Sequence, residues 1–214
     1  TKIAYNVHPN KCVDGITFLQ NDGNEYPLEI FGDHNLQNLN ASLEICLGLG
    51  LTKEQFYQSI QTFKGASRRL ELIDENSSCS IFKDFAHSPS KLKATSSAVK
   101  KQFTNRKLIA CMELHTFSSL NEEFLREYAN TMDLPDEAFV YFNPQTIAHK
   151  KLKKISKEQV FNCFNRSDLR VFTSSDEFVK ELKSRSWENL NLLLMSSGNF
   201  DGVDFNELVK ELLD

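Results

Sequence analysis

Glycine is scarce in this sequence, with eight among 214 residues, and none lies in a G-x-G-x-x-G or G-x-x-x-x-G-K-[ST] pattern. Loops with those patterns expose backbone N–H groups that hold nucleotide phosphates. If the chain binds a nucleotide, it therefore does so without a phosphate-binding loop of its own.

Other absences exclude further classes of protein. No apolar run approaches the roughly 18 residues that a membrane-spanning helix needs, and no signal peptide opens the chain. The net charge is −4 and the pI about 5.8, whereas a general nucleic-acid binder would carry a basic surplus. We therefore expect neither a membrane nor a nucleic acid among the partners of this protein.

The spacings of common metal and hydrolase sites are also missing. The cysteines form no C-x-x-C pair, the histidines have no ligand spacing, and there is no G-x-S-x-G motif. The cysteines are odd in number and most lie in apolar runs, so we expect buried free thiols in a cytoplasmic protein. They are residues 12, 46, 79, 111 and 163.

From Arg68 onward, short apolar runs alternate with amphipathic segments. Strands are expected at 69–73, 79–85, 107–113, 137–142, 169–173 and 191–196. Helices are expected at 89–103, 120–132, 157–164, 175–185 and 204–213. This alternation predicts an α/β fold: a Rossmann-like, mostly parallel sheet with helices on both faces. Its functional groups should lie in the loops at the carboxyl ends of the strands.

The segment before Arg68 has a different pattern. Residues 1–31 resemble a β-meander with a turn at Asn21-Asp-Gly-Asn, and an apolar stripe predicts a helix over 36–47. Thr52 and Gln55 form a capping box for a further helix, which ends at Gly65. We therefore expect a small α+β unit over residues 1–64 and a larger domain over 65–214. The chain does not begin with Met, so we expect it to be a piece of a longer protein.

Asp84 and His87 are the first candidates for a functional site. They end an apolar strand, and Ser88-Pro89 then begins a helix. A carboxylate there can accept two hydroxyl hydrogen bonds from a ribose. The alternative, about equally weighted, is an Asp–His pair that holds its own loop.

Two other polar segments allow both a functional and a structural interpretation. Asn35 beside His34 can bind a purine edge or simply cap a helix, and capping is favoured for that segment alone. Arg68 and Arg69 can hold a phosphate or ribose, or form a weak surface ion pair with Glu71.

The loop after the third strand of the larger domain contains His115, which can orient an anionic or amine substrate or serve as a structural histidine. The segment from Ser196 to Gly202 is explained mostly by turn chemistry. Lys150-Lys-Leu-Lys-Lys154 is interpreted as a solvated face.

Taken together, three segments resemble the Mur ligase family of ATP-dependent enzymes that form peptide bonds. The family pattern G-x-H-N-x-x-N-x-x-A-[AS] corresponds to residues 32–42, G-x-x-R-R-x-E to 65–71 and D-[YF]-[AG]-H-x-P to 84–89. Their order and spacing also agree. Residues 115–118 are similar to the H-x-Y-S segment of the branch that joins alanine, or recycled murein tripeptide, to UDP-N-acetylmuramate. Ser119 stands where an arginine often follows that segment.

The resemblance implies an architecture. Residues 1–64 would be the end of a central ATPase domain, and residues 65–214 a complete C-terminal Rossmann-like domain. The phosphate-binding loop, a carbamylated lysine and the main Mg²⁺ ligands would lie upstream of residue 1. The isolated chain would then be inactive.

The resemblance also implies roles. ATP would phosphorylate a substrate carboxylate, and the incoming amine would attack the acyl phosphate. The implied nucleotide contacts are His34, Asn35 and Asn38 for adenine, and Arg69 and Asp84 for ribose, with His87 and Arg68 close by. His115 and Ser118 would face the incoming amino acid or peptide. No catalytic residue and no metal ligand is expected within the chain. The alternatives are a non-catalytic α/β binding module derived from this fold and a folylpolyglutamate synthase-like ligase.

Overall fold

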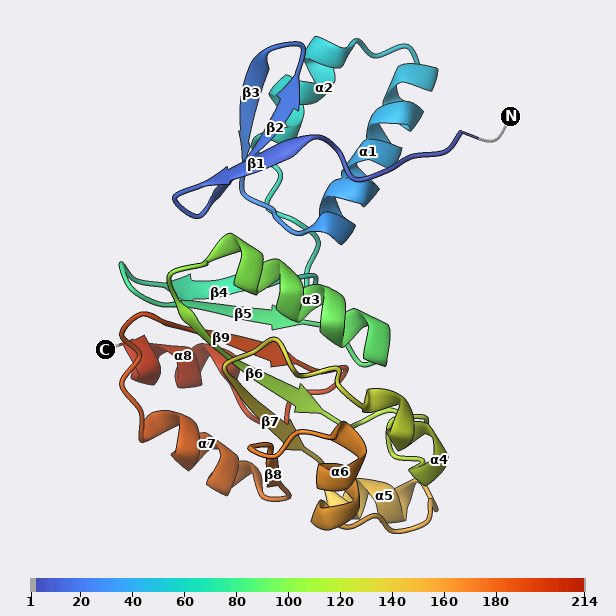
Figure 1. The fold of residues 1–214 in the computed structure, drawn as a ribbon, viewed down its shortest axis with the longest axis vertical. Helices are drawn as coiled ribbons and strands as arrows, with labels where there is room; N and C mark the ends of the chain where they lie inside the picture. The colour runs from blue at the N-terminus through green and yellow to red at the C-terminus, as the bar shows by residue number, and fades with distance from the viewer. Residues whose placement is uncertain (1–2, 214) are drawn as a thin grey trace. The chain divides into compact units, whose positions relative to one another are not determined.

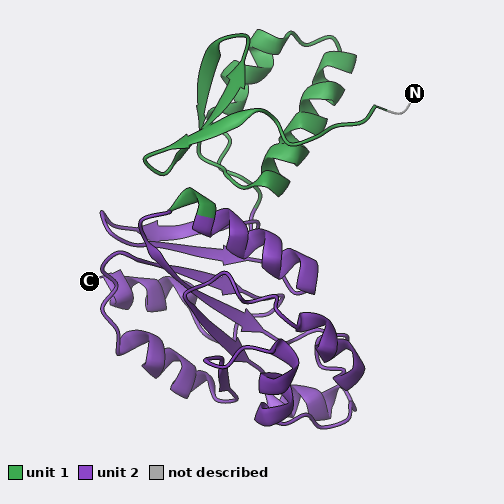
Figure 2. Cartoon of the chain, viewed as in Figure 1, with its two compact units in different colours: residues 1–66, 101–103 green, residues 67–100, 104–214 purple. Residues whose placement is uncertain are grey.

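The structure, a computed structural model, describes residues 3–213. The chain divides into two compact units, residues 1–66 with 101–103 and residues 67–100 with 104–214 (Figure 2). The assignment of these units to particular domains of a ligase stays a prediction.

The first unit packs a small antiparallel sheet against two helices. β1 (Asn10–Val13), β2 (Ile16–Asn21) and β3 (Asn24–Leu28) pair in chain order, and α1 (Asp33–Gly48) and α2 (Lys53–Ile60) follow. Asp22 and Gly23 have φ angles of 50° and 82°, as the predicted hairpin turn requires. The predicted capping box of Thr52 and Gln55 is present. The core consists of Leu19, Leu28, Ile30, Leu36, Leu39, Leu43, Phe56 and Tyr57.

The second unit is built on a six-stranded sheet in the order β4-β5-β9-β6-β7-β8 (Figure 1). The strands are β4 (Glu71–Glu75), β5 (Ser80–Asp84), β6 (Lys107–Glu113), β7 (Glu137–Tyr141), β8 (Arg170–Phe172) and β9 (Leu190–Met195). β4 pairs antiparallel with β5, and the other neighbours are parallel. The prediction of a mostly parallel α/β sheet is confirmed.

Helices cover both faces of this sheet, which explains why every residue of β9 is buried. They are α3 (Pro89–Gln102), α4 (Glu122–Leu125) with the 3₁₀ turn η1 (Arg126–Tyr128), α5 (Pro144–His149), α6 (Lys157–Phe164), α7 (Ser175–Lys183) and α8 (Phe205–Leu213). Side chains of α7 and α8 pack with Ile81, Ile109 and Leu192 in one core. α3 lies on the opposite face (Figure 1).

Two segments differ from the predicted helices. The helix expected over 120–132 is broken into α4 and η1, and its N-cap is Asn121, whose side chain accepts the N–H groups of Glu123 and Phe124. α5 was not predicted, although Asn143 caps it and Pro144 occupies its first turn. Such short helices carry too few residues for a periodic apolar pattern.

The sheet topology places three loop regions next to one another. Because β5, β9 and β6 are adjacent and parallel, their carboxyl ends meet at one edge of the sheet. Asp84 ends β5, Glu113 ends β6, and Ser196 follows β9 directly. This carboxyl edge is where the candidate site lies.

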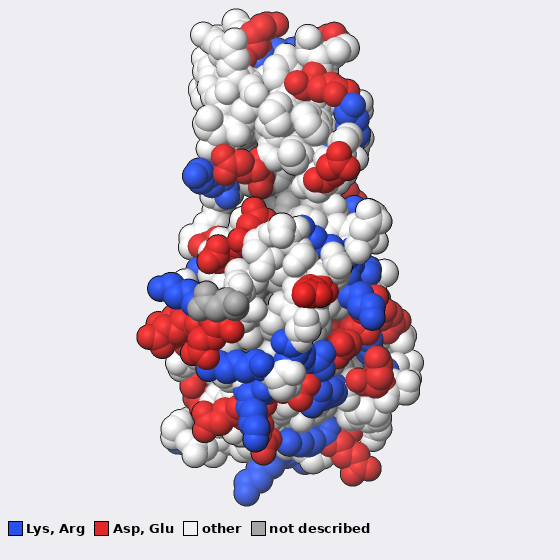
Figure 3. Space-filling view, turned by 90° about the vertical axis from the view of Figure 1, so that its left-hand side faces the viewer, with Lys and Arg blue, Asp and Glu red and all other residues white. Residues whose placement is uncertain are grey.

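Over the part of the chain that the structure describes, no helix is long and apolar enough to cross a membrane. On the face shown in Figure 3, basic and acidic side chains intermingle over the second unit. Ion pairs of the second unit include that of Arg170 with Glu181 and that of Arg185 with Glu137.

Candidate functional site

The Asp84 carboxylate is buried and binds two backbone amides. Its Oδ2 accepts the N–H of Leu70 over 2.6 Å, and its Oδ1 accepts the N–H of Ala86 over 2.6 Å. The side chain therefore joins the end of β5 to the segment before β4. The two oxygens thus fix the backbone on both sides of the carboxylate.

The segment before β4 has a constrained backbone. Arg68 and Leu70 have φ angles of 58° and 48°, in the left-handed region that side chains rarely adopt. The N–H of Phe85 donates to the carbonyl of Arg68 over 2.8 Å, which adds a second link to the β5 end. Arg69, which stands between Arg68 and Leu70, is exposed. Its Cζ lies 5.9 Å from the ring centre of Phe85.

Glu71 contacts a backbone amide and a lysine instead of the predicted ion pair with the side chain of Arg68 or Arg69. Its Oε2 accepts the backbone N–H of Arg68 over 2.6 Å, and its Oε1 lies 3.1 Å from Nζ of Lys83. Burial acts to raise the pKa of Glu71, but these contacts and the hydroxyl of Ser67 outweigh it, so the pKa is lowered. Glu71 thus stabilises the backbone of this segment, while the Arg68 side chain is exposed.

His87 is held by the backbone. Its Nδ1 lies 2.9 Å from the carbonyl of Phe85, and its own carbonyl accepts the hydroxyl of Tyr128 over 2.6 Å. Asp84 and His87 therefore both hold the loop after β5, and each does so through main-chain groups. The structure places Asp84, His87, Arg68 and Arg69 around one loop.

His34, Asn35 and Asn38 belong to the first turns of α1 in the first unit. The N-cap of that helix is Gly32, with a φ of 92° and no side-chain cap. The capping role considered for His34 and Asn35 is therefore not seen. Instead, Nδ2 of Asn35 donates to the carbonyl of Phe31 over 2.9 Å, which fixes the orientation of the amide. The side chain of Asn38 is exposed.

His115 lies beside a buried carboxylate that sequence reasoning missed. Its Nδ1 is 3.4 Å from Oε1 of Glu113, and the Glu113 side chain is 3% exposed against 40% for His115. The other oxygen of Glu113 accepts the Ser196 hydroxyl and, over 2.9 Å, the N–H of Phe200. A glutamate at the end of an otherwise apolar β6 was the available signal.

Ser118, the second predicted acceptor residue, is exposed in the turn before α4. The hydroxyl of Thr116 lies 3.2 Å from that of Ser118 and donates to that of Ser119 over 2.9 Å. The exposed Phe117 ring has Nζ of Lys150 at 4.2 Å from its centre. This turn therefore presents a hydroxyl and an aromatic ring, with the ammonium group of Lys150 from the end of α5 beside the ring.

A cleft of about 110 Å³ lies at the carboxyl edge, beside Asp84 and Ser196. It is lined by Arg68, Lys83, Asp84, Leu194, Ser196, Gly198, Asn199 and Phe205. Two cations and several hydrogen-bonding groups thus border one small space, which suits a polar or anionic ligand.

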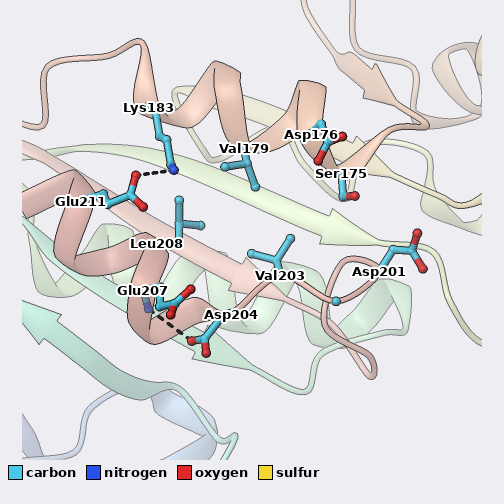
Figure 4. A pocket seen from close by; sticks show the side chains of 11 residues that line it. Ser175, Asp176, Val179, Lys183, Asp201, Val203, Asp204, Glu207, Leu208 and Glu211 are labelled. Carbon is cyan, nitrogen blue, oxygen red and sulfur yellow. Dashed lines mark hydrogen bonds and ion pairs between the residues drawn. The ribbon is translucent and has the colours of Figure 1, made fainter.

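A second hollow, of about 260 Å³, lies between α7 and α8 (Figure 4). Its acidic lining residues are Asp176, Asp201, Asp204, Glu207 and Glu211, and Lys183 pairs with Glu211. Phosphate groups would be repelled there, so we do not assign it to a nucleotide. Within residues 3–213 no group of three or more histidine, cysteine or carboxylate side chains could hold a metal ion.

Together, the fold and the edge residues define a Rossmann-like α/β domain with a polar site at the carboxyl edge of its sheet. The family profile described as "Mur ligase, glutamate ligase domain" matches residues 68–198, more than half of the chain. The chain belongs to the Mur ligase family.

Curated relatives agree with this membership. The chain is 37% identical over 123 residues to the UDP-N-acetylmuramate–L-alanine ligase of Sulfurihydrogenibium sp., covering 58% of this chain and 27% of that one. It is 28% identical over 197 residues to the ligase of the same name from Roseiflexus sp., covering 88% and 39%. The chain thus aligns with well under half the length of these relatives.

Solved structures share the fold. The UDP-N-acetylmuramate–alanine ligase of Thermotoga maritima has a TM-score of 0.69 at 16% identity, with 95% of this chain and 44% of that one covered. The murein peptide ligase of Psychrobacter arcticus has a TM-score of 0.59 at 20% identity, covering 95% and 43%. The folylpolyglutamate synthase of Mycobacterium tuberculosis, solved with ADP and AMPPCP, has a TM-score of 0.59 at 17% identity, covering 89% and 45%.

Proposed function

We propose that this chain is the C-terminal part of a cytoplasmic ligase that joins an amino acid or a peptide to the carboxylate of UDP-N-acetylmuramate, with ATP and Mg²⁺. The supporting observation is the convergence of Asp84, Ser196 and Glu113 at adjacent strand ends in a Mur ligase domain. Residues 1–64 would be the end of the central ATPase domain, and 65–214 the C-terminal domain.

The nucleotide contacts in this proposal are assigned residue by residue. His34, Asn35 and Asn38 contact adenine, and the amide of Asn35, held by the Phe31 carbonyl, suits that role. Arg69 and Asp84 hold the ribose, with Arg68 and His87 beside them. The exposed guanidinium groups supply donors, and a carboxylate such as Asp84 is an acceptor of the kind that ribose hydroxyl groups bind.

ATP transfers its γ-phosphoryl group to the substrate carboxylate, and the acceptor amine then attacks the acyl phosphate. His115 and Ser118 face that acceptor. The Mg²⁺ ligands and the phosphate-binding loop belong to a part of the protein outside this chain, so the isolated chain is inactive. The reduced state expected in the cytoplasm is compatible with the free cysteines.

The test is a ligation assay of the full-length protein with ATP, Mg²⁺ and UDP-N-acetylmuramate, offered alanine and murein tripeptide in parallel. We expect ATP-dependent release of phosphate and a product heavier by one acceptor with one of the two. A folyl substrate with glutamate serves as a third arm. Turnover only in that arm would support a folylpolyglutamate synthase instead, and no turnover in any arm would support a non-catalytic module.

A further inference from the structure

Glu113 is a buried carboxylate that the proposed roles do not use. It follows the apolar run of β6, and its Oε2 is occupied by two donors, the Ser196 hydroxyl and the Phe200 N–H. The N–H of Gly198 donates in turn to the Ser196 oxygen over 2.6 Å, which directs the Ser196 proton toward Glu113. The remaining oxygen, Oε1, lies 3.4 Å from Nδ1 of His115.

Gly198 gives this arrangement its space. A Cβ atom at that position would lie 2.9 Å from Oε2 of Glu113 and 3.2 Å from Nδ1 of His115. Real Cβ atoms almost never approach another atom closer than 3.0 Å. The main chain after β9 therefore packs directly on the carboxylate and the ring, and it keeps both in place.

We propose that Glu113 and His115 form a carboxylate–imidazole dyad that deprotonates the incoming amine of the ligation reaction. Glu113 is the positioning residue: it accepts the Nδ1–H of His115 and so fixes the tautomer in which Nε2 carries a lone pair. His115 is the catalytic base, because its 40% exposed side chain can reach a substrate. Contacts of this kind are often long without substrate and shorten when it binds.

The proton balance of the step is complete. Nε2 of His115 takes one proton from the acceptor ammonium group, leaving a neutral amine with its lone pair. That lone pair forms the C–N bond at the acyl carbon, and the C–O bond to phosphate breaks with its electrons on the phosphate. The amide nitrogen loses its second proton to the departing phosphate. This inference rests on the proposed ligase function for its substrate, but the dyad itself can be tested without activity.

The direct test is the tautomer of His115, measured by long-range ¹H–¹⁵N correlation spectra of the ¹⁵N-histidine-labelled chain at a pH where the imidazoles are neutral. Free imidazole side chains favour the Nε2–H form. We expect Nδ1 of His115 to resonate as a protonated nitrogen and Nε2 as an unprotonated one. The resonances are assigned with His115→Gln. An Nε2–H tautomer in the unsubstituted chain would overturn the dyad.

Glu113→Gln provides the matched variant. The Phe200 N–H can only donate, so the amide oxygen must take its place and the amide NH₂ turns toward His115. We therefore expect the tautomer to reverse while the other histidine signals stay unchanged. Gly198→Ala should also abolish the Nδ1–H signature. Gly48→Ala is the control, because nothing lies within 4 Å of its added Cβ. An unchanged His115 tautomer in both Glu113→Gln and Gly198→Ala would contradict the proposal.

Kinetics of the full-length protein separate a base from a merely structural residue. His115→Gln should lower kcat for amide formation about 100-fold, with little change in the KM for ATP. Hydroxylamine is already unprotonated near neutral pH, so hydroxamate formation from the acyl phosphate should survive both His115→Gln and Glu113→Gln. Equal loss of both products would overturn the role as base. No product from the unsubstituted protein would instead refute the proposed function and leave the tautomer result standing.

Discussion

The Asp84 carboxylate accepts the backbone N–H of Leu70 over 2.6 Å, although these residues are 14 positions apart. The bond holds a segment in which Arg68 and Leu70 both have left-handed φ angles. Such conformations persist where surrounding contacts over-determine them, and they are concentrated at functional sites. Asp84 therefore helps to fix the backbone of the segment that carries Arg69.

Arg69→Ala is expected to weaken nucleotide binding with little loss of stability. The guanidinium is exposed and its contact with Phe85 is long, at 5.9 Å, so the fold depends little on it. A charge-assisted hydrogen bond contributes about 1.5–3 kcal/mol, so the KM for ATP in the full-length ligase should rise roughly 10- to 100-fold. Steady-state kinetics at varied ATP measure the change. Arg126 is an exposed arginine on η1, so Arg126→Ala serves as the control. An unchanged KM for ATP in Arg69→Ala would remove Arg69 from the nucleotide site.

Asp84→Ala is expected to destabilise the second unit as well as to raise the KM for ATP. It leaves the N–H groups of Leu70 and Ala86 without their acceptor in a buried position. Each buried unsatisfied group costs about 1–3 kcal/mol, so the loss of both acceptors should lower the free energy of unfolding by roughly 2–6 kcal/mol. Urea titration followed by circular dichroism gives this value. Asp74→Ala, at an exposed site on β4, should change it by less than about 0.5 kcal/mol. Equal effects of the two substitutions would contradict this account of Asp84.

Most of the second unit could be predicted because its strands and long helices repeat regularly. β6 occupies the expected residues 107–113, and α3 and α6 differ from prediction by at most one residue at an end. The parallel sheet follows from the alternation of these elements. The short α5 and the division of the 120–132 segment depend on the caps Asn143 and Asn121. Helices of 6 and 4 residues are too short to leave a periodic apolar signal.

The site residues show the same division between local and non-local information. Asp84 and His115 were found because they end or follow apolar strands. Glu113 and Ser196 were missed as a pair, since residues 83 positions apart meet only through the β6–β9 pairing. β9 is the last strand in the chain but lies between β5 and β6, and no pattern in the sequence alone gives that order.

Asp136 should make the stability of the second unit dependent on acidic pH. Burial acts to raise the pKa of its carboxyl group, but the ammonium of Lys100 at 2.7 Å and the N–H of Leu108 at 2.7 Å outweigh it, so the pKa is lowered. A lowered pKa means that the folded state favours the carboxylate. The stabilisation is therefore complete above the ordinary pKa of about 3.8 and is lost as the pH falls through the lower folded value.

Asp136→Asn should accordingly lower the free energy of unfolding at neutral pH by about 1 kcal/mol, since the group is partly exposed. The difference from the unsubstituted chain should shrink as the pH falls below about 4. Urea titrations at a series of pH values measure it. Asp133→Asn, at an exposed position in the same loop, is the control substitution. A difference that grows on acidification would have the wrong sign for this mechanism.

The cysteines should differ sharply in their reactivity toward a thiol reagent. Burial raises the pKa of the Cys79 thiol to about 12 and that of Cys111 well above its ordinary value, and both side chains are 0% exposed. Because only the thiolate reacts, both should be protected in the folded chain at mildly alkaline pH, whereas the exposed Cys12 should react at once. Timed labelling with a maleimide and peptide mass spectrometry distinguishes the sites. Cys12→Ser should remove the fast phase of labelling. In urea, the protected thiols should become reactive as the second unit unfolds. Rapid labelling of Cys79 in the folded chain would show that the core around β5 opens without global unfolding.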